Sequence, residues 1–133
     1  MAGASDYLEA KILNDLFGLA AFTPPTNFYI ALFTAAPSDS GGGTEVSGNA
    51  YARVQVPANS TYWTLSGSTI SNLLAITFAA PSPANWGTVT HFGGYDASSG
   101  GNLLFWDALA VSRLTSVGVP LSFAIGALTL NAD

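Results

Sequence analysis

Beyond Pro24-Pro25 the chain is divided into short apolar segments by stretches rich in Gly, Pro, Ser and Asn, and this division limits the fold most. Short apolar segments bounded by turn-forming residues predict β-strands. The segments expected to be strands are residues 27–34, 51–56, 62–65, 70–78, 86–95, 102–110 and 120–130. Residues 27–34 are apolar on both faces, as in a central strand. The Gly-rich residues 35–48 are expected to form a long, flexible loop, and Gly93-Gly94 to weaken or bulge its strand.

An amphipathic helix is predicted before the double proline, at residues 5–18. Ser5 or Asp6 can cap its N-terminus, and Glu9, three residues after Asp6, resembles part of a capping box. Gly18 is expected at the C-terminal cap. Large apolar side chains recur at helical spacing and form one face: Leu8, Ile12, Leu13, Leu16 and Phe17. This face must pack on something, and the sequence leaves open whether that is the domain's own sheet or a neighbouring protein.

One helix followed by strands, in a chain of 133 residues, is compatible with a single hydrophobic core. We therefore predict a mainly β fold, a single-domain antiparallel β-sandwich of about seven strands with one N-terminal α-helix. The expected domain covers residues 1–133, with the sandwich at residues 27–130.

Charged side chains are scarce, at 8% of residues, against roughly a quarter in an average soluble domain. Because an isolated domain usually needs a charged surface to stay soluble, this composition favours a protein that neighbours cover in a large assembly. Lys11, Arg53 and Arg113 are the only basic residues besides His91, and the net charge is −5. Binding to nucleic acid or to an anionic membrane surface is therefore not expected. Residues 1–5 do not resemble a secretory signal, and no apolar stretch is long enough to predict a membrane span.

Residues able to support catalysis or metal binding are few. His91 is the only histidine, and no Gly-x-Ser-x-Gly motif is present that would indicate serine hydrolysis. A zinc site is improbable without cysteine. Asp39, Glu45, Asp96 and Asp107 are in or near loops, but they do not follow a calcium-loop pattern. We predict no enzymatic activity, no catalytic residue, no metal and no cofactor.

Aromatic side chains on the strands are the candidates for sugar binding. They are Tyr51, Tyr62, Trp63, Trp86 and Tyr95. Strand Trp and Tyr residues more often anchor a core or an interface, so a carbohydrate-binding module is the weakest of the alternatives.

Several blocks of sequence, spread from end to end, resemble a family of small structural proteins of tailed-bacteriophage particles, commonly labelled tail fibre proteins. The blocks are residues 5–9 (Ser-Asp-Tyr-Leu-Glu), 12–14, 28–34 (Phe-Tyr-Ile-Ala-Leu-Phe-Thr), 37–48, 51–53 (Tyr-Ala-Arg), 86–93 (Trp-Gly-Thr-Val-Thr-His-Phe-Gly) and 100–104. The resemblance implies a component of the virion, assembled in the bacterial host cytoplasm, and carries over no catalytic residue.

Two functions follow as expectations. The first is a decoration (cement) protein on the outer face of the phage head, which bridges capsid subunits. The second is a tail or tail-fibre component involved in host attachment. The expected partners are the major capsid protein or tail proteins, together with further copies of this chain. The residues expected to make the contact are Tyr7, Leu8, Ile12, Leu16, Phe17, Gly41, Gly42, Gly43 and Glu45, and the loop at 41–48 is expected to order only on assembly.

Overall fold

The computed structural model describes residues 3–131 and contains eleven strands and one helix in that range. In chain order they are β1 (Gly3–Ala4), α1 (Asp6–Leu16), β2 (Asn27–Ala35), β3 (Thr44–Glu45), β4 (Val54–Pro57), β5 (Trp63–Ser66), β6 (Thr69–Asn72), β7 (Ile76–Phe78), β8 (Thr88–Tyr95), β9 (Leu103–Leu114), β10 (Leu121–Phe123) and β11 (Thr129–Asn131). The predicted mainly β class with one N-terminal helix is confirmed, and strands outnumber the seven expected.

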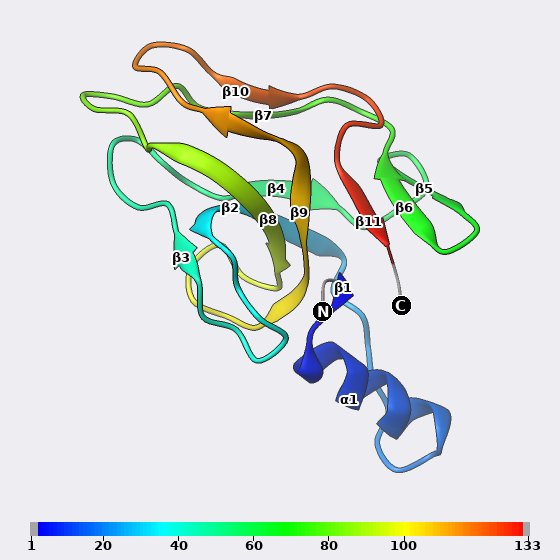
Figure 1. The fold of residues 1–133 in the computed structure, drawn as a ribbon. Coiled ribbons are helices and arrows are strands. Elements are labelled where there is room, and N and C mark those ends of the chain that lie inside the picture. The colour runs from blue at the N-terminus through cyan, green and yellow to red at the C-terminus, as the bar shows by residue number, and fades with distance from the viewer. Residues whose placement is uncertain (1–2, 132–133) are drawn as a thin grey trace.

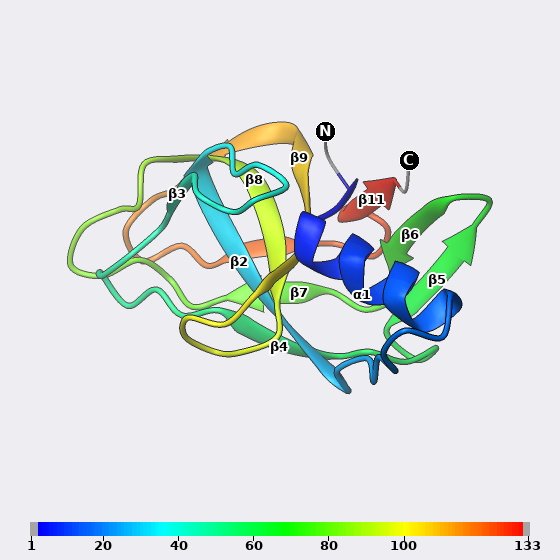
Figure 2. The same cartoon turned by 90° about the horizontal axis from the view of Figure 1, so that it is seen from below.

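The largest sheet has six strands, all paired antiparallel. Its order is β1-β9-β8-β2-β3, and β4 pairs with the first half of β2 while β3 pairs with its end. Two smaller antiparallel sheets, β7–β10 and β5–β6–β11, complete the fold. Figures 1 and 2 show β3 at one side of the molecule and the β5–β6–β11 sheet at the other; α1 lies at the bottom in Figure 1 and in front in Figure 2.

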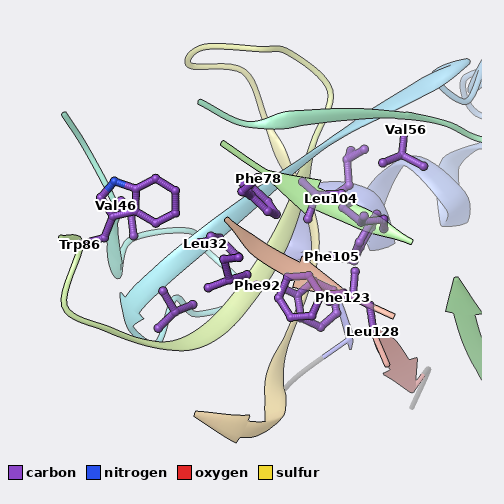
Figure 3. Packing of buried hydrophobic residues seen from close by; sticks show 14 residues of the cluster. Leu32, Val46, Val56, Phe78, Trp86, Phe92, Leu104, Phe105, Phe123 and Leu128 are labelled. Atoms are coloured by element: carbon purple, nitrogen blue, oxygen red, sulfur yellow. The ribbon is translucent and has the colours of Figure 1, made fainter. Parts of the chain in front are cut away.

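The hydrophobic core lies between the six-stranded sheet and the two smaller sheets (Figure 3). Leu32, Phe92 and Phe105 come from the large sheet, and Phe78 and Phe123 from the β7–β10 pair. The rings of Phe78 and Phe123 meet edge-on with their centroids 6.3 Å apart, which is a favourable aromatic geometry. The smaller sheets therefore cover the apolar face of the large one.

β2 is buried on both faces, as its sequence predicts. The four residues from Ile30 to Phe33 have no exposed surface, and Phe33 stacks on Tyr95 at 6.4 Å. In β8, a Cβ atom at Gly94 would overlap the ring of Phe105. The strand register shifts after Gly94, so the predicted bulge is present, and glycine is needed there because the neighbouring ring occupies the side-chain position.

Most predicted strands differ from the observed ones at their ends, β9 by running four residues past the predicted end at residue 110, and three differ by a late start or a break. Residues 51–53 precede β4, because Asn49 and Ala50 have positive φ angles of 53° and 69° and turn the backbone away from an extended path. Residues 70–78 are two strands, β6 and β7, which belong to different sheets. Residues 120–130 are likewise divided into β10 and β11.

Asn72 explains why both of these segments break at the same place. Its side chain is 1% exposed; the amide nitrogen donates to the carbonyl oxygens of Leu74 (2.9 Å) and Ala124 (3.0 Å), and the amide oxygen accepts from the Leu128 N–H (3.0 Å). One buried amide thus holds the turn after β6 against the turn between β10 and β11. Apolar periodicity indicates only which residues are buried. It does not predict this break, because the break depends on the hydrogen bonds of a polar side chain.

The segment 35–48, expected to be a flexible loop, is held by regular hydrogen bonds. It includes β3, and Ser38 and Gly41 form an isolated bridge with bonds of 2.9 Å in both directions. Gly43 has a φ of +74°, and a Cβ there would lie 2.7 Å from the backbone nitrogen of Pro37. The segment is a loop, as predicted, and its glycine run forms a tight, closely packed turn.

β1 and β11 lie side by side next to β9. Gly3 pairs with Trp106 of β9, and a Cβ at Gly3 would lie 3.0 Å from the carbonyl oxygen of Asn131. The first and last described strands are therefore neighbours, as the ribbon also shows (Figure 1).

Candidate assembly surface

The helix α1 is anchored to the sheet at its N-terminal end. Ser5 is the N-cap, as one of the two predicted alternatives, and its hydroxyl accepts from the Leu8 N–H at 3.2 Å. The same hydroxyl donates to the carbonyl oxygen of Leu103, and the Ser5 N–H donates to that of Leu104 at 2.9 Å. Ser5 is 1% exposed. This one buried residue both caps the N-terminus of the helix and fixes the helix to β9. Gly18, with a φ of +69°, follows the C-cap as expected.

Beyond its first turn the helix presents apolar side chains to solvent. Tyr7 and Leu8 are half-buried and pack against the core. Five further residues form what we call the helix patch, with their exposed fractions in parentheses: Ile12 (48%), Leu13 (54%), Leu16 (72%), Phe17 (71%) and Leu19 (77%). At about 100° per residue, the four that lie in the helix or at its cap cover roughly 140° of its circumference. The sequence left open whether the domain's own sheet or a neighbouring protein covers the apolar face of the helix. In the structure the domain covers only the first turn of the helix.

The predicted glycine loop meets the start of the helix in a polar groove of about 480 Å³. Its lining consists of Asp6, Tyr7, Asp39, Ser40, Gly41, Gly42, Tyr95, Gly101, Asn102 and Leu103. The Asp6 N–H donates to the carbonyl oxygen of Asp39 at 2.9 Å, and the Trp106 indole N–H donates to the Asp39 carboxylate at 3.0 Å. The structure therefore brings Tyr7, Gly41 and Gly42 together. Their part in an interface stays a prediction.

Glu45 belongs to a separate cluster inside the domain. Its carboxylate accepts two parallel bonds from Arg53, at 2.8 and 2.9 Å, and one of 2.8 Å from the Tyr51 hydroxyl. Arg53 also donates to the carbonyl oxygens of Ala97 and Gly100 at 2.9 and 2.8 Å. Arg53 thus ties β3 to the turn that follows β8, and its planar fork suits these bonds better than a lysine would.

The electrostatics of this cluster follow from burial and hydrogen bonding. Burial raises the pKa of the Tyr51 phenol, and the bond to Glu45 adds to the shift. Arg53 lies 3.7 Å from the Tyr95 ring centroid, and its bond to Glu45 raises its pKa. For Asp96, burial alone would raise the pKa, but hydrogen bonds from Asn102 outweigh it and hold the pKa below its usual value. The charges here serve to hold loops in place.

A second apolar surface lies at the opposite end of the molecule from α1 (Figure 1). The β9 patch consists of Val111 (73% exposed), Leu114 (73%), Val117 (52%) and Val119 (57%). β9 bulges at this place. Between two successive paired positions β8 advances by two residues, from Val89 to His91, whereas β9 contributes five, between Ala108 and Arg113. Residues 111–119 lie between two predicted strands, and the apolar surface was not predicted there. Apolar Val117 and Val119 in this connecting segment were the available signal.

An apolar pocket of about 380 Å³ lies between the large sheet and the β5–β6–β11 sheet. Its lining is Phe28, Ala58, Asn59, Trp63, Thr64, Leu65, Ile70, Phe92, Phe105, Leu128 and Leu130. Small-molecule sites usually add a few converging polar groups to such a surface. Here Asn59 and Thr64 are the two polar side chains, and the Asn59 oxygen already accepts from the Thr61 N–H at 3.0 Å.

The side chains considered for sugar binding pack within the domain. Trp86 is 8% exposed, and its ring meets that of Tyr51 edge-on at 5.5 Å. Tyr62 and Trp63 pack on the core, and Tyr95 lies under Arg53.

The catalytic and metal-ligating candidates do not assemble into a site in the part of the chain that the structure describes. The His91 ring nitrogen Nδ1 lies 2.7 Å from the Thr90 hydroxyl, and the ring lies 6.0 Å from that of Trp106. No three His, Cys, Asp or Glu side chains gather among residues 3–131. No helix in that range is long and apolar enough to cross a membrane.

Comparison with known protein families decides what kind of molecule presents these two patches. The family model described as "Podophage GP4 fiber I protein gp80" matches residues 3–131. The chain belongs to this family. The gp80 fibre family is a family of phage virion proteins of the tail-fibre type, which confirms the resemblance seen in the sequence. A search of curated proteins gave no match. As a gp80 family member the chain has a fibre-related structural role in a phage particle.

Proposed function

We propose that the protein is a structural subunit of a fibre on the phage particle, held there by contacts with other virion proteins. The observation that carries the proposal is the family match over residues 3–131, whose description names a fibre protein. The exposed helix patch supports it, because five large apolar residues that are 48–77% exposed are typical of a surface that a partner covers.

The scarcity of charge supports the same proposal. With 8% charged residues, the protein has little with which to keep an isolated surface hydrated. A fibre subunit is covered by its neighbours, so it tolerates such a composition. A decoration protein would share this property, but the family description names a fibre and gives no support to decoration.

Copy number tests the proposal. Quantitative mass spectrometry of purified particles would give the ratio of this protein to the major capsid protein. A fibre subunit is expected at a few to a few tens of copies per particle, and antibody labelling should place it at the fibres. Several hundred copies in fixed ratio to the capsid protein would replace the fibre by decoration. Absence from the particle would refute both.

A further inference from the structure

We infer that copies of this protein pack head to tail, with the helix patch of one copy on the β9 patch of the next. The inference rests on the proposed fibre role and names the partner of the exposed helix, which is a second copy of the same chain. The two patches lie at opposite ends of the molecule (Figure 1), so their pairing joins different surfaces on the two copies. Such heterologous contacts generate rings or open filaments, whereas a symmetric contact closes after two copies.

The exposed areas of the two patches match each other. If each residue of the patches would expose roughly 150–200 Å² when uncovered, the helix patch presents about 480–640 Å² and the β9 patch about 380–510 Å² at their exposed fractions. Together they approach the lower end of the range of about 1,200–2,000 Å² buried in specific protein interfaces. Two helix patches paired with each other would bury a similar area, so the choice between these two pairings rests on the charges around the patches.

The charges around the patches are complementary. Residues 6–17 contain Asp6, Glu9 and Asp15 against Lys11, which gives a net charge of −2. Arg113 is the only charged residue between positions 108 and 123. It is half-buried, donates to the carbonyl oxygen of Ser122 at 3.1 Å, and carries its positive charge in the strand segment that includes Val111 and Leu114. Two helix patches placed against each other would bring like charges together, whereas the head-to-tail pairing sets an acidic helix beside a basic strand.

Two variants, each with one end blocked, test the inference with purified full-length protein. The helix variant carries Leu16→Asp and Phe17→Asp. The strand variant carries Val111→Asp and Leu114→Asp, and a second strand variant, Val117→Asp with Val119→Asp, alters the turn in place of the strand. Leu65→Asp is the matched control, since Leu65 is equally exposed at 65% and lies outside both patches. Circular dichroism and thermal melting establish that each variant is folded.

Light scattering coupled to size exclusion gives the decisive masses. The unmodified protein and the Leu65→Asp control should rise above the 13.6 kDa monomer mass with increasing concentration. Each blocked variant alone should stay monomeric. An equimolar mixture of the helix variant with either strand variant should give twice the monomer mass, because each contributes the surface that the other lacks.

Other results overturn the inference. A strand variant that associates as the unmodified protein does would show that the β9 patch is not the partner of the helix patch. A mixture that stays monomeric, or a control that loses association, would place the contact elsewhere. If the protein is monomeric but present on particles in fibre-like copy number, this inference fails and the fibre role stands. If it associates head to tail but is absent from particles, the fibre role fails.

Discussion

Replacing Asn72 by alanine should destabilise the protein more than any other single polar-to-alanine change in the β5–β6–β11 region. The buried side chain makes three hydrogen bonds and joins the end of β6 to the turn before β11. Its removal leaves the N–H of Leu128, a residue that is 1% exposed, without its partner. A buried donor left unpaired costs about 1–3 kcal/mol of the free energy of unfolding.

The two carbonyl oxygens add less to this cost. Leu74 and Ala124 are both exposed, so water replaces part of each bond, and each loss contributes about 0.5–1 kcal/mol. The expected total is therefore about 2–5 kcal/mol. With an m-value of about 1.5 kcal/mol per molar urea for a domain of this size, the midpoint of unfolding should fall by roughly 1.3–3.3 M.

Urea unfolding followed by the fluorescence of the three tryptophans provides the assay. Asn131→Ala is the matched control, because the Asn131 amide oxygen accepts from the Thr69 hydroxyl at 2.6 Å but the residue is exposed. The control should shift the midpoint by less than about 0.5 M. If Asn72→Ala and Asn131→Ala give equal midpoints, the buried amide does not hold the two turns together and the account of the strand break is wrong.

Three further changes test the Arg53 cluster. Arg53→Lys should lower the free energy of unfolding by about 1–2 kcal/mol, because a lysine keeps the charge but not the two parallel bonds to Glu45. Urea titration measures this change. An unchanged free energy of unfolding would show that the two parallel bonds do not stabilise the protein. Because burial raises the pKa of Tyr51, its contribution is fully present below about pH 10 and is lost as the pH rises through the folded pKa. Thermal melts of Tyr51→Phe should therefore show a smaller loss of stability above pH 10 than the unmodified protein, and an equal loss would contradict the assignment. The pKa of Asp96 is lowered in the folded state, so its contribution is present above about pH 4 and is lost as the pH falls through the folded value. Asp96→Asn should melt lower at pH 7 and show a smaller difference between pH 7 and pH 3; an unchanged difference would assign the acid sensitivity to another carboxylate.

Apolar periodicity predicted the elements whose burial is regular. The run in β2 and the helix start at Ser5 follow from local pattern and capping, and both were predicted with bounds that differ by one or two residues from those observed. The breaks inside residues 70–78 and 120–130 were not predictable in this way, since Asn72 acts through bonds to residues about fifty positions away. The local signals were a polar residue inside the first run and Gly126 inside the second.

The assembly surface was predictable in part. Ile12, Leu16 and Phe17 were identified as contact residues from the helical pattern, and the structure leaves them exposed; that they touch a partner remains a prediction. Glu45 was predicted as a contact residue because it lies in the same loop as Gly41, Gly42 and Gly43. In the structure its carboxylate is bound by Arg53 and Tyr51. The part of the β9 patch at Val111 and Leu114 was missed because β9 is extended past a register shift with β8 that no local pattern encodes. Val117 and Val119 were the part that the sequence signalled.

Because β1 and β11 are neighbours, the order of the strands along the chain can be changed without changing their positions in the fold. Gly3 and Asn131 are close enough for a short linker to join them, and the exposed turn at Gly67 between β5 and β6 offers a place to open the backbone. A circularly permuted chain that begins after Gly67 would retain every strand pairing of the large sheet. It would also move both ends away from α1 and the β9 patch, so that a fluorophore or an affinity handle attached there leaves the two poles of the subunit unobstructed.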